Sequence, residues 1–307
     1  MNPGAASLSS STPLVSVVLI CWNHERFVRA AVESALGQTY TNLQLIVIDN
    51  GSADSSPRQL EQLAREHPGR FTLVLRPENA GLIPALNQGL AMAGGPYFTA
   101  LSTDDMWLPD KVERQVAFLE SHPEVHMISG QMRVIDEEGR PSDWQARRHA
   151  GEVTFEDLMR DGCMVNGPTL MCRTEALRAV GGYDPNVKIE DYSLALAFTH
   201  RGLKVVARDE VDTLYRRHGN NWTARPVWAE RLEIGRVYRS HPEYKAFVRR
   251  NLAGYFRHLA GHDKRRALKL LREEPLAWTL DDVGVGLLKL LVPRSLLGRY
   301  RAAGRGS

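Results

Sequence analysis

The stretch PLVSVVLICWNHERFVRAAVESALGQTYTNLQLIVIDNGSADSS, residues 13–56, decides the fold class. It starts with an aliphatic, β-branched run at 14–20, which is typical of a strand buried on both faces of a parallel sheet. Apolar residues at helical spacing follow over 25–38, and Gly37 marks the end of that helix. A second apolar strand is expected over 43–49. This strand–helix–strand order predicts a parallel sheet covered by helices.

The alternation continues along the chain and then changes. Further helices are expected over 55–67, 82–93 and 109–121, and further strands over 71–76 and 96–102. From residue 125, extended segments at 125–136, 168–173 and 203–208 follow without long helices between them. Beyond about residue 220 the chain is helical and basic. The sequence therefore predicts an α/β fold with a mixed central sheet and a C-terminal helical extension.

Charge is distributed unevenly along the 307 residues, whose net charge is +3. Residues 216–307 carry 20 Lys and Arg against 8 Asp and Glu, and residues 1–215 carry 19 against 28. The three cysteines lack CxxC spacing, so we expect them to be reduced in a cytoplasmic protein. Residues 1–12 are small and polar and are expected to be a disordered tail. There is no apolar run of about 18 residues, so no membrane-spanning helix is expected.

Polar side chains and glycines follow each of the four front strands. They are Asn23 and Glu25, then Asp49, then Asn79 and Gly81, and finally Asp104 and Asp105. Ligands of an open parallel sheet bind beyond the carboxyl ends of its strands. There is no GxxxxGKS/T motif, and no GxGxxG follows the first strand, so a nucleotide must be held by other means. A carboxylate can accept a hydrogen bond from a base N–H, and a divalent cation can join a diphosphate to Asp.

Each acidic feature also has an ordinary structural interpretation. Asp49 begins Asp-Asn-Gly-Ser, which can be a tight turn because Asn-Gly is a strong turn pair. Asp104-Asp105 can cap the helix expected over 109–121. Glu190-Asp191 precedes an apolar helical run, where it can offset the helix dipole or supply a general base. The first two features stand at strand ends of one sheet, and this placement favours a binding site.

The chain resembles the family-2 glycosyltransferases of the GT-A fold, which is Rossmann-like. Residues 13–56 look like the opening of that family, and the resemblance continues through ENAGLIPALNQGLAMAGGPYFTALSTDD at 78–105. It resumes at GGYDPNVKIEDYSLALAFTHRGLKVV (181–206) and LYRRHGNNW (214–222), with the motifs in family order. The resemblance implies a glycosyltransferase domain over 13–222 and leaves 223–307 as a basic helical extension.

The resemblance implies a donor-binding role for the residues that match the family around the first three strands. Asp49 matches the carboxylate that contacts the nucleotide base, and Asn23 and Glu25 match the loop that lines the nucleotide. Three residues match a pattern on the nucleotide-sugar side, and these are Asn79, Gly81 and Asn87.

The metal and catalytic residues are also implied by the resemblance. Asp104 and Asp105 match the end of the metal-binding acidic motif, and Asp104 also contacts the donor. His218 lies in a segment that closes over the diphosphate, so we assign it to donor and metal binding. Asp191, preceded by Glu190, matches the base that deprotonates the acceptor hydroxyl.

Two positions depart from the family pattern. Asn50 and Ser102 stand where many relatives carry Asp. The cation is then expected to depend on Asp104, with Asp105 and phosphate oxygens assisting, which suits Mn²⁺ or Mg²⁺. Its affinity without nucleotide is expected to be weak. Arg216 and Arg217 are expected to add positive charge nearby.

The expected reaction is sugar transfer from a UDP- or dTDP-sugar, and one base with one direct displacement implies inversion. The expected acceptor is a glycan in lipopolysaccharide, O-antigen or other surface polysaccharide synthesis, with rhamnosyl transfer as a specific case. A polyprenyl-linked or protein acceptor is the alternative within the enzymes. A non-catalytic nucleotide-sugar-binding protein is the alternative outside them.

The basic C-terminal part has two interpretations. Its apolar faces can pack on the catalytic domain, or its basic helices can bind an anionic lipid surface. The second interpretation places the protein peripherally on the cytoplasmic face of the inner membrane, where it meets a lipid-linked acceptor. Nucleic acid is not an expected partner, because the front half is acidic and there is no basic motif interleaved with aromatic residues.

Overall fold

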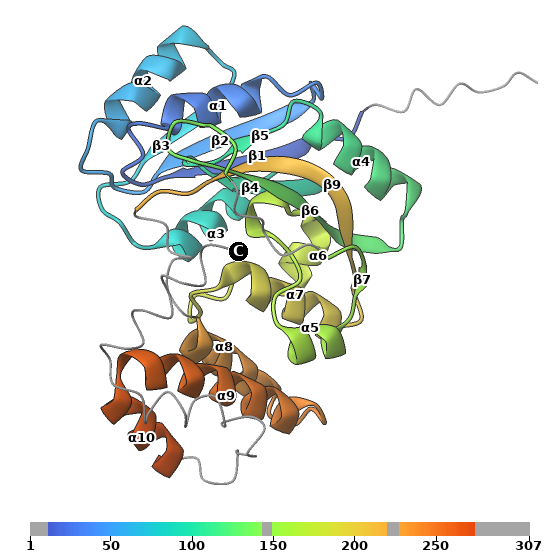
Figure 1. Cartoon of the computed structure of the whole chain (residues 1–307). Coiled ribbons are helices and arrows are strands. Elements are labelled where there is room, and N and C mark those ends of the chain that lie inside the picture. Colours follow the sequence, from blue (N-terminus) through green and yellow to red (C-terminus); the bar gives the residue numbers. More distant parts are fainter. Residues whose placement is uncertain (1–11, 143–148, 220–226, 274–307) are drawn as a thin grey trace, which may run out of the picture. The chain divides into compact units, whose positions relative to one another are not determined.

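A mixed sheet of nine strands organises the residues described by the computed structural model, which are 12–142, 149–219 and 227–273 (Figure 1). The strands are β1 (Val15–Cys21), β2 (Leu43–Asp49), β3 (Thr72–Leu75), β4 (Tyr97–Ser102), β5 (Met106–Trp107), β6 (Val125–Ile135), β7 (Gly151–Val153), β8 (Met171–Arg173) and β9 (Lys204–Arg216). Their order in the sheet is β3-β2-β1-β4-β8-β6-β9-β5, and β7 pairs with β9. The mixed sheet confirms the predicted fold class.

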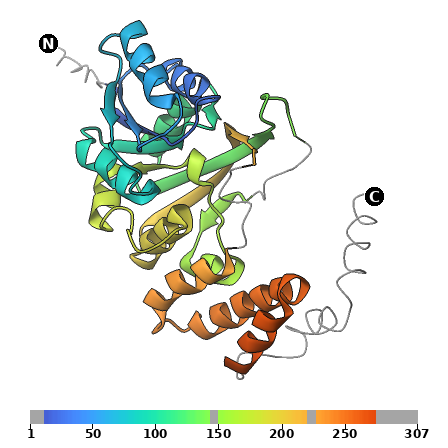
Figure 2. The same ribbon diagram turned by 90° about the vertical axis from the view of Figure 1, so that its left-hand side faces the viewer.

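Helices cover both faces of this sheet. Figures 1 and 2 show α1 (Val28–Leu36), α2 (Ser56–Glu66) and α4 (Lys111–Ser121) on one face. The opposite face carries α3 (Leu82–Met92), α6 (Thr174–Ala179) and α7 (Glu190–His200). A 3-10 turn, η1 (Gly167–Thr169), precedes β8. This layering follows from strands that are apolar on both sides.

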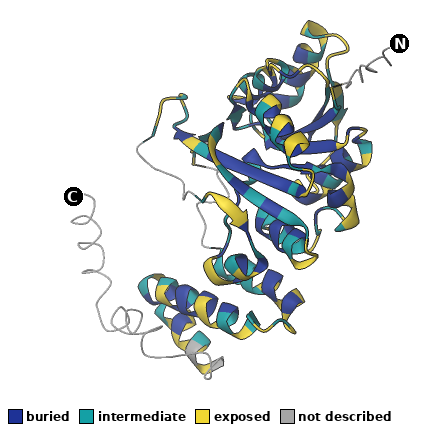
Figure 3. Ribbon diagram, turned by 90° about the vertical axis from the view of Figure 1, so that its right-hand side faces the viewer, coloured by how far each residue is buried: buried dark blue, intermediate teal, exposed yellow. Residues whose placement is uncertain are grey.

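The core lies between the sheet and its helices, as the dark blue strands of Figure 3 show. All seven residues of β1 are buried. Its side chains Val15, Val17, Leu19 and Cys21 belong to one cluster with buried residues of α1, α2 and α4. Val18 faces the other way and contacts α3, whose Gly89 has no room for a side chain. Burial on both faces explains why this strand has no polar alternation.

Strand register brings four strand ends to one edge of the sheet. Cys21 of β1 pairs with Asp49 of β2, and Ile20 pairs with Ser102 of β4. On the far side of the sheet, β9 runs parallel to β6 and antiparallel to β5. The end of β9 at Arg216 therefore lies near the turn that joins β4 to β5. This register positions the candidate site.

The structure extends or replaces several expected elements. The strand expected over 203–208 continues as β9 to Arg216, through charged residues that hide it in the sequence. Asp212 in this strand is 1 % exposed and accepts a hydrogen bond from Gln115 Nε2 (2.8 Å). The elements β5, β7 and α5 (Phe155–Asp161) were not expected. Helix α4 has Asp110 at its N-cap, so Asp104-Asp105 does not cap it.

The chain divides into two compact units. The first spans 1–155, 163–186 and 190–218, and the second spans 156–162, 187–189 and 219–307. The second contains α8 (Trp228–Gly235), η3 (Arg236–Tyr238), α9 (Tyr244–His262) and α10 (Lys264–Glu273). No helix of the described residues is long and apolar enough to cross a membrane. Residues 1–11 of the tail expected over 1–12, the expected boundary at 222/223 and the last basic stretch at 274–307 lie outside the described residues.

Candidate active site

Asn23 and Glu25 brace the loop that follows β2. Asn23 has a left-handed backbone, with φ of 56°. Its N–H donates to Ser52 Oγ (2.9 Å), and its Oδ1 accepts from Ala53 N (2.8 Å). Glu25 Oε2 accepts from both the backbone N–H (3.0 Å) and the hydroxyl (2.7 Å) of Ser55. These contacts join the first two strand-end loops, and the expected nucleotide contacts of both residues stay predictions.

Asp49 ends β2 with one oxygen bonded and one free. Asp49 is 1 % exposed. Its Oδ2 accepts a hydrogen bond from Ser52 N (3.0 Å), as the tight-turn interpretation requires. Oδ1 is buried and has no hydrogen-bond partner among the described residues. A buried acceptor without a partner is unfavourable unless a ligand supplies a donor. Both interpretations of this aspartate therefore fit the structure together.

An amide pair holds the loop between β3 and α3. Asn50 Nδ2 donates to Asn79 Oδ1 (2.8 Å) and to the carbonyl of Gly81 (3.1 Å). Asn79 Oδ1 also accepts from Gly81 N (2.7 Å), and Arg76 Nη1 donates to Asn50 Oδ1 (3.0 Å). The Asn at position 50 is therefore a cross-link between the second and third strand-end loops. This contact gives the first departure from the family pattern a structural purpose.

Asn87 lies on α3, and both polar atoms of its side-chain amide form hydrogen bonds with the backbone of one residue, Tyr183. Its Nδ2 donates to the carbonyl of Tyr183 (2.7 Å), and its Oδ1 accepts from Tyr183 N (2.9 Å). The two bonds fasten the loop that precedes α7. The expected contact of Asn87 with the sugar stays a prediction.

Three side chains converge on a candidate metal centre. His218 Nε2 lies 3.1 Å from Asp104 Oδ2, and His24 Nε2 lies 3.9 Å from the same oxygen. The ligand atoms of the three residues all lie within 4.8 Å of one another. Asp104 Oδ1 is buried without a hydrogen-bond partner among the described residues. Two imidazoles and one carboxylate, whose Oδ1 is buried and unpaired among the described residues, fit a divalent cation.

The pKa directions of Asp104 and His24 are those that would suit the binding of a cation. Burial by itself would raise the pKa of Asp104, but the hydrogen bond with His218 and, whenever His24 is protonated, the charge of that imidazole hold this pKa below its usual value. Burial lowers the pKa of His24 and so favours its neutral form. His24 Nδ1 lies 3.0 Å from Thr103 Oγ1, and a hydrogen bond donated there leaves the Nε2 lone pair for a metal.

His24 is a member that sequence reasoning did not assign. It lies in the same loop as Asn23 and Glu25, but nothing in the spacing connects it to Asp104, which lies 80 positions later. Only the pairing of β1 with β4 brings the two together.

Asp105 lies next to the cluster without belonging to it. It is 2 % exposed, and its Oδ1 accepts from the backbone N–H of Arg216 (2.7 Å). Burial, together with the charge of Asp104, raises its pKa well above the usual value. Its expected role as a metal ligand stays a prediction, and the contact observed is an anchor between β9 and the β4–β5 turn.

Glu190 and Asp191 form the first residues of α7. Asp191 Oδ2 accepts from Gly167 N (3.2 Å) and Oδ1 accepts from Tyr192 N (2.7 Å). Burial and the charge of Asp191 raise the pKa of Glu190 to about 8. A pKa of about 8 favours the protonated form of Glu190 at neutral pH. An ionised carboxylate beside a neutral acid is chemically able to accept a proton.

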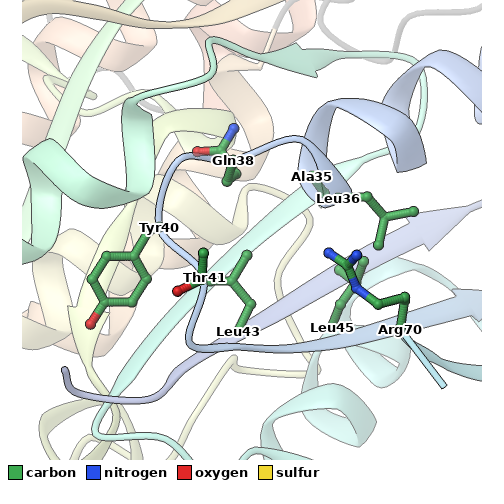
Figure 4. Close-up of a pocket in the computed structure, with 8 residues that line it drawn as sticks. All are labelled: Ala35, Leu36, Gln38, Tyr40, Thr41, Leu43, Leu45 and Arg70. Carbon is green, nitrogen blue, oxygen red and sulfur yellow. The ribbon is translucent and has the colours of Figure 1, made fainter. Parts of the chain in front are cut away.

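A cavity of about 60 Å³ lies elsewhere, between the end of α1 and the beginning of β2 (Figure 4). Gln38, Tyr40 and Arg70 are among the residues that line it. The Tyr40 hydroxyl donates to the carbonyl of Pro13 (2.5 Å), and Gln38 Nε2 donates to two backbone carbonyls. This cavity lies at the opposite end of β2 from Asp49 and takes no part in the candidate active site.

Known proteins are similar to this chain in sequence and in fold. A putative glycosyltransferase, EpsE of Bacillus subtilis, is 33% identical over 198 residues, which are 64% of this chain and 70% of EpsE. An uncharacterized glycosyltransferase of Rickettsia typhi is 29% identical over 195 residues, or 61% of this chain and 59% of that protein.

Two solved structures share the fold at low identity. One is Staphylococcus aureus TarS 1–349 in complex with UDP-GlcNAc, with a TM-score of 0.62, 17% identity, and 94% of this chain and 87% of that chain covered. The other is the mannosyltransferase PcManGT from Pyrobaculum calidifontis in complex with GDP-Man and Mn²⁺, with a TM-score of 0.61, 19% identity and coverage of 96% and 87%. The model of glycosyl transferase family 2 matches residues 16–180. The chain therefore belongs to glycosyltransferase family 2, has the GT-A fold and is a glycosyltransferase enzyme.

Proposed function

We propose that this enzyme transfers a sugar from a nucleoside-diphosphate donor to a hydroxyl of a glycan acceptor, with inversion at the anomeric carbon. The observation that carries the proposal is the convergence of His24, Asp104 and His218 at the strand edge that also ends in Asp49. A base-binding carboxylate and a cation-binding cluster at one edge match the two ends of a nucleoside diphosphate. TarS and PcManGT, which share the fold, were both solved with nucleotide sugars.

The donor base is assigned to Asp49. Its free Oδ1 is an acceptor, and uracil, thymine and guanine all present a ring N–H that can donate to it. The loops held by Asn23, Glu25 and Asn79 surround this position and are assigned to the nucleotide. Gly81 and Asn87 belong to the sugar side in the same proposal.

The metal is assigned to Asp104 and His218, with His24 as the third ligand. Two imidazole nitrogens favour Mn²⁺ over Mg²⁺, which prefers an all-oxygen shell. The bound cation would offset the negative charge of the diphosphate leaving group. Asp105 stays assigned to the metal as an assisting residue, and its observed contact is the anchor to the Arg216 backbone.

The base is assigned to Asp191, which is held by Gly167 N–H at the beginning of a rigid helix. Its carboxylate takes the acceptor proton while the hydroxyl oxygen bonds to the anomeric carbon and the nucleoside diphosphate leaves. One displacement from the opposite face inverts the configuration. The raised pKa of Glu190 favours its protonated form at neutral pH, so Asp191 is the member of the pair assigned to accept the proton.

The acceptor is assigned to surface polysaccharide synthesis, such as lipopolysaccharide or O-antigen, with dTDP-rhamnose as one candidate donor. A polyprenyl-linked or protein acceptor is the alternative. Similarity to EpsE supports the glycosyltransferase class and leaves the choice of sugar to experiment.

A donor panel tests this function. Purified protein is mixed with UDP-, dTDP- and GDP-sugars and Mn²⁺, and nucleotide release is measured. We expect release with one donor class and its loss in Asp191→Asn. The matched control is Glu175→Gln, an exposed acid in the first turn of α6. Equal release by wild type and Asp191→Asn would refute the assigned base, and no nucleotide binding would refute the function.

A second proposal concerns the basic helices of the second unit, which we assign to an anionic lipid surface. Helix α9 carries four Lys and Arg and no Asp or Glu, and α10 carries five against one Glu. Leu268 of α10 is 49 % exposed beside Lys269. Basic side chains with exposed apolar neighbours favour anionic membranes.

Liposome flotation tests the lipid proposal in the intact chain. The first variant replaces three exposed residues of α10 with Gln: Arg265, Lys269 and Arg272. The control variant replaces three exposed arginines of the first unit with Gln: Arg58, Arg65 and Arg70. We expect only the first variant to lose flotation with anionic vesicles, and equal flotation of both would refute the assignment.

A further inference from the structure

Arg216 is a buried arginine whose donors are directed at the backbone around the metal cluster. It is 4 % exposed and is the last residue of β9. Its Nε donates to the carbonyl of Asp104 (2.9 Å), and its own backbone N–H donates to Asp105 Oδ1 (2.7 Å). Its Nη1 donates to the carbonyls of Asp136 (3.0 Å) and Glu137 (2.8 Å), just beyond β6.

The same guanidinium also contacts the loop that carries His24. Its central carbon lies 4.7 Å from the centroid of the Phe27 ring, and that ring lies 5.3 Å from the ring of His218. The backbone N–H of Phe27 donates to the carbonyl of His24 (2.8 Å). One side chain therefore touches the segments that carry all three candidate ligands, since His218 follows Arg216 by two residues.

These contacts determine what Arg216 can do. Its Nε and Nη1 donate to main-chain carbonyls and so hold the backbone, while the positive charge that it is expected to add near the site stays a prediction. A planar guanidinium can satisfy several acceptors at fixed angles, whereas a lysine offers one compact charge. Groups that orient metal ligands from outside the coordination shell change metal affinity when they are removed.

We propose that Arg216 is a positioning residue that sets the separation between Asp104 and His218 and thereby the affinity of the site for a divalent cation. It holds the Asp104 backbone from β9, so the carboxylate and the imidazole approach to 3.1 Å from segments 114 positions apart. Asp105 completes the same clamp through the Arg216 backbone N–H. The inference rests on the proposed metal site.

Binding of Mn²⁺ alone, measured by electron paramagnetic resonance, tests the proposal without turnover. The variants are Arg216→Lys, which keeps the charge, and Arg216→Met, which removes it. The control is Arg133→Met, an exposed arginine on neighbouring β6. We expect both Arg216 variants to bind Mn²⁺ roughly 10- to 100-fold more weakly, with reduced imidazole nitrogen modulation in pulsed spectra, while the control binds like wild type.

The outcomes separate this inference from the metal site itself. If wild type does not bind Mn²⁺, the metal site and the inference both fail. If wild type binds and both Arg216 variants bind within twofold of it, only the role of Arg216 fails. Loss in Arg216→Met with full retention in Arg216→Lys overturns the clamp in favour of a simple charge effect. Near-UV circular dichroism checks folding, and if neither variant folds, unchanged Mn²⁺ affinity in Phe27→Leu overturns the proposal.

Discussion

Replacing Asp49 with Asn should weaken nucleotide binding without unfolding the protein. Asn can still accept the Ser52 N–H at one oxygen, so the turn after β2 keeps its 3.0 Å bond. The free acceptor Oδ1 is replaced by an NH₂ group that opposes the N–H of the base. A hydrogen bond to a charged group contributes ~1.5–3 kcal/mol. The dissociation constant for UDP should therefore rise roughly 10- to 150-fold.

Calorimetric titration with UDP and CDP, without metal, measures this effect. Cytosine has no ring N–H at the equivalent position, so wild type should bind CDP more weakly and Asp49→Asn should narrow the difference. Glu78→Gln removes an exposed acid from the neighbouring loop and should bind UDP like wild type. A UDP affinity of Asp49→Asn within twofold of wild type would refute the reasoning. A loss of affinity that comes with a large fall in melting temperature would also refute it, because the variant would then be unfolding.

Three further predictions test other parts of the molecule. Asp104→Ala should abolish both Mn²⁺ binding and transfer, while Ser102→Ala should be mild because Ser102 is not a member of the candidate metal cluster; a severe defect in the serine variant contradicts this ligand assignment. Because the pKa of Glu190 rises from 4.5 to about 8 on folding, the folded state binds the extra proton, so the free energy of unfolding should fall between pH 4.5 and 8. Urea unfolding at several pH values should show that the free energy of unfolding of Glu190→Gln depends less on pH than that of wild type. The same pH dependence in both proteins would contradict the raised pKa of Glu190. Gly69→Ala should lose ~1–2 kcal/mol for its left-handed backbone. Gly51→Ala, with the same φ of 72°, should lose clearly more stability because its Cβ would lie 2.3 Å from the Glu78 carbonyl carbon. Equal urea midpoints of the Gly51→Ala and Gly69→Ala variants would disprove the clash.

Strands that are recognisable from their own apolar residues could be predicted from the sequence. The apolar runs of β1 and β2 identify buried parallel strands because each residue reports its own burial. Strand β9 was predicted at only its first half, because its second half is charged. Asp212 is buried there beside partners from α4: Gln115, 97 positions away, donates to Oδ2 (2.8 Å), and Arg114 Nη2 lies 3.1 Å from Oδ1. Such a compensation has no local trace.

The candidate site shows the same division at the level of single atoms. Asp104 and His218 could be named from the family resemblance, while His24 could not, because no spacing links it to them. The sequence also could not separate residues with free atoms from residues that hold the loops. Asn87 has both amide atoms bonded to Tyr183, whereas Asp49 retains an unpaired oxygen.

The sequence by itself determined the layered α/β architecture, the family and the sheet edge at which ligands are expected to bind. These follow from apolar periodicity, turn residues and the order of motifs, which are short-range properties of the chain. The tertiary structure decided which polar atoms at that edge remain available and which pair with the fold. It did so through strand register, because the pairing of β9 with β6 and β5 brings Arg216 and His218 to Asp104 from more than a hundred residues away.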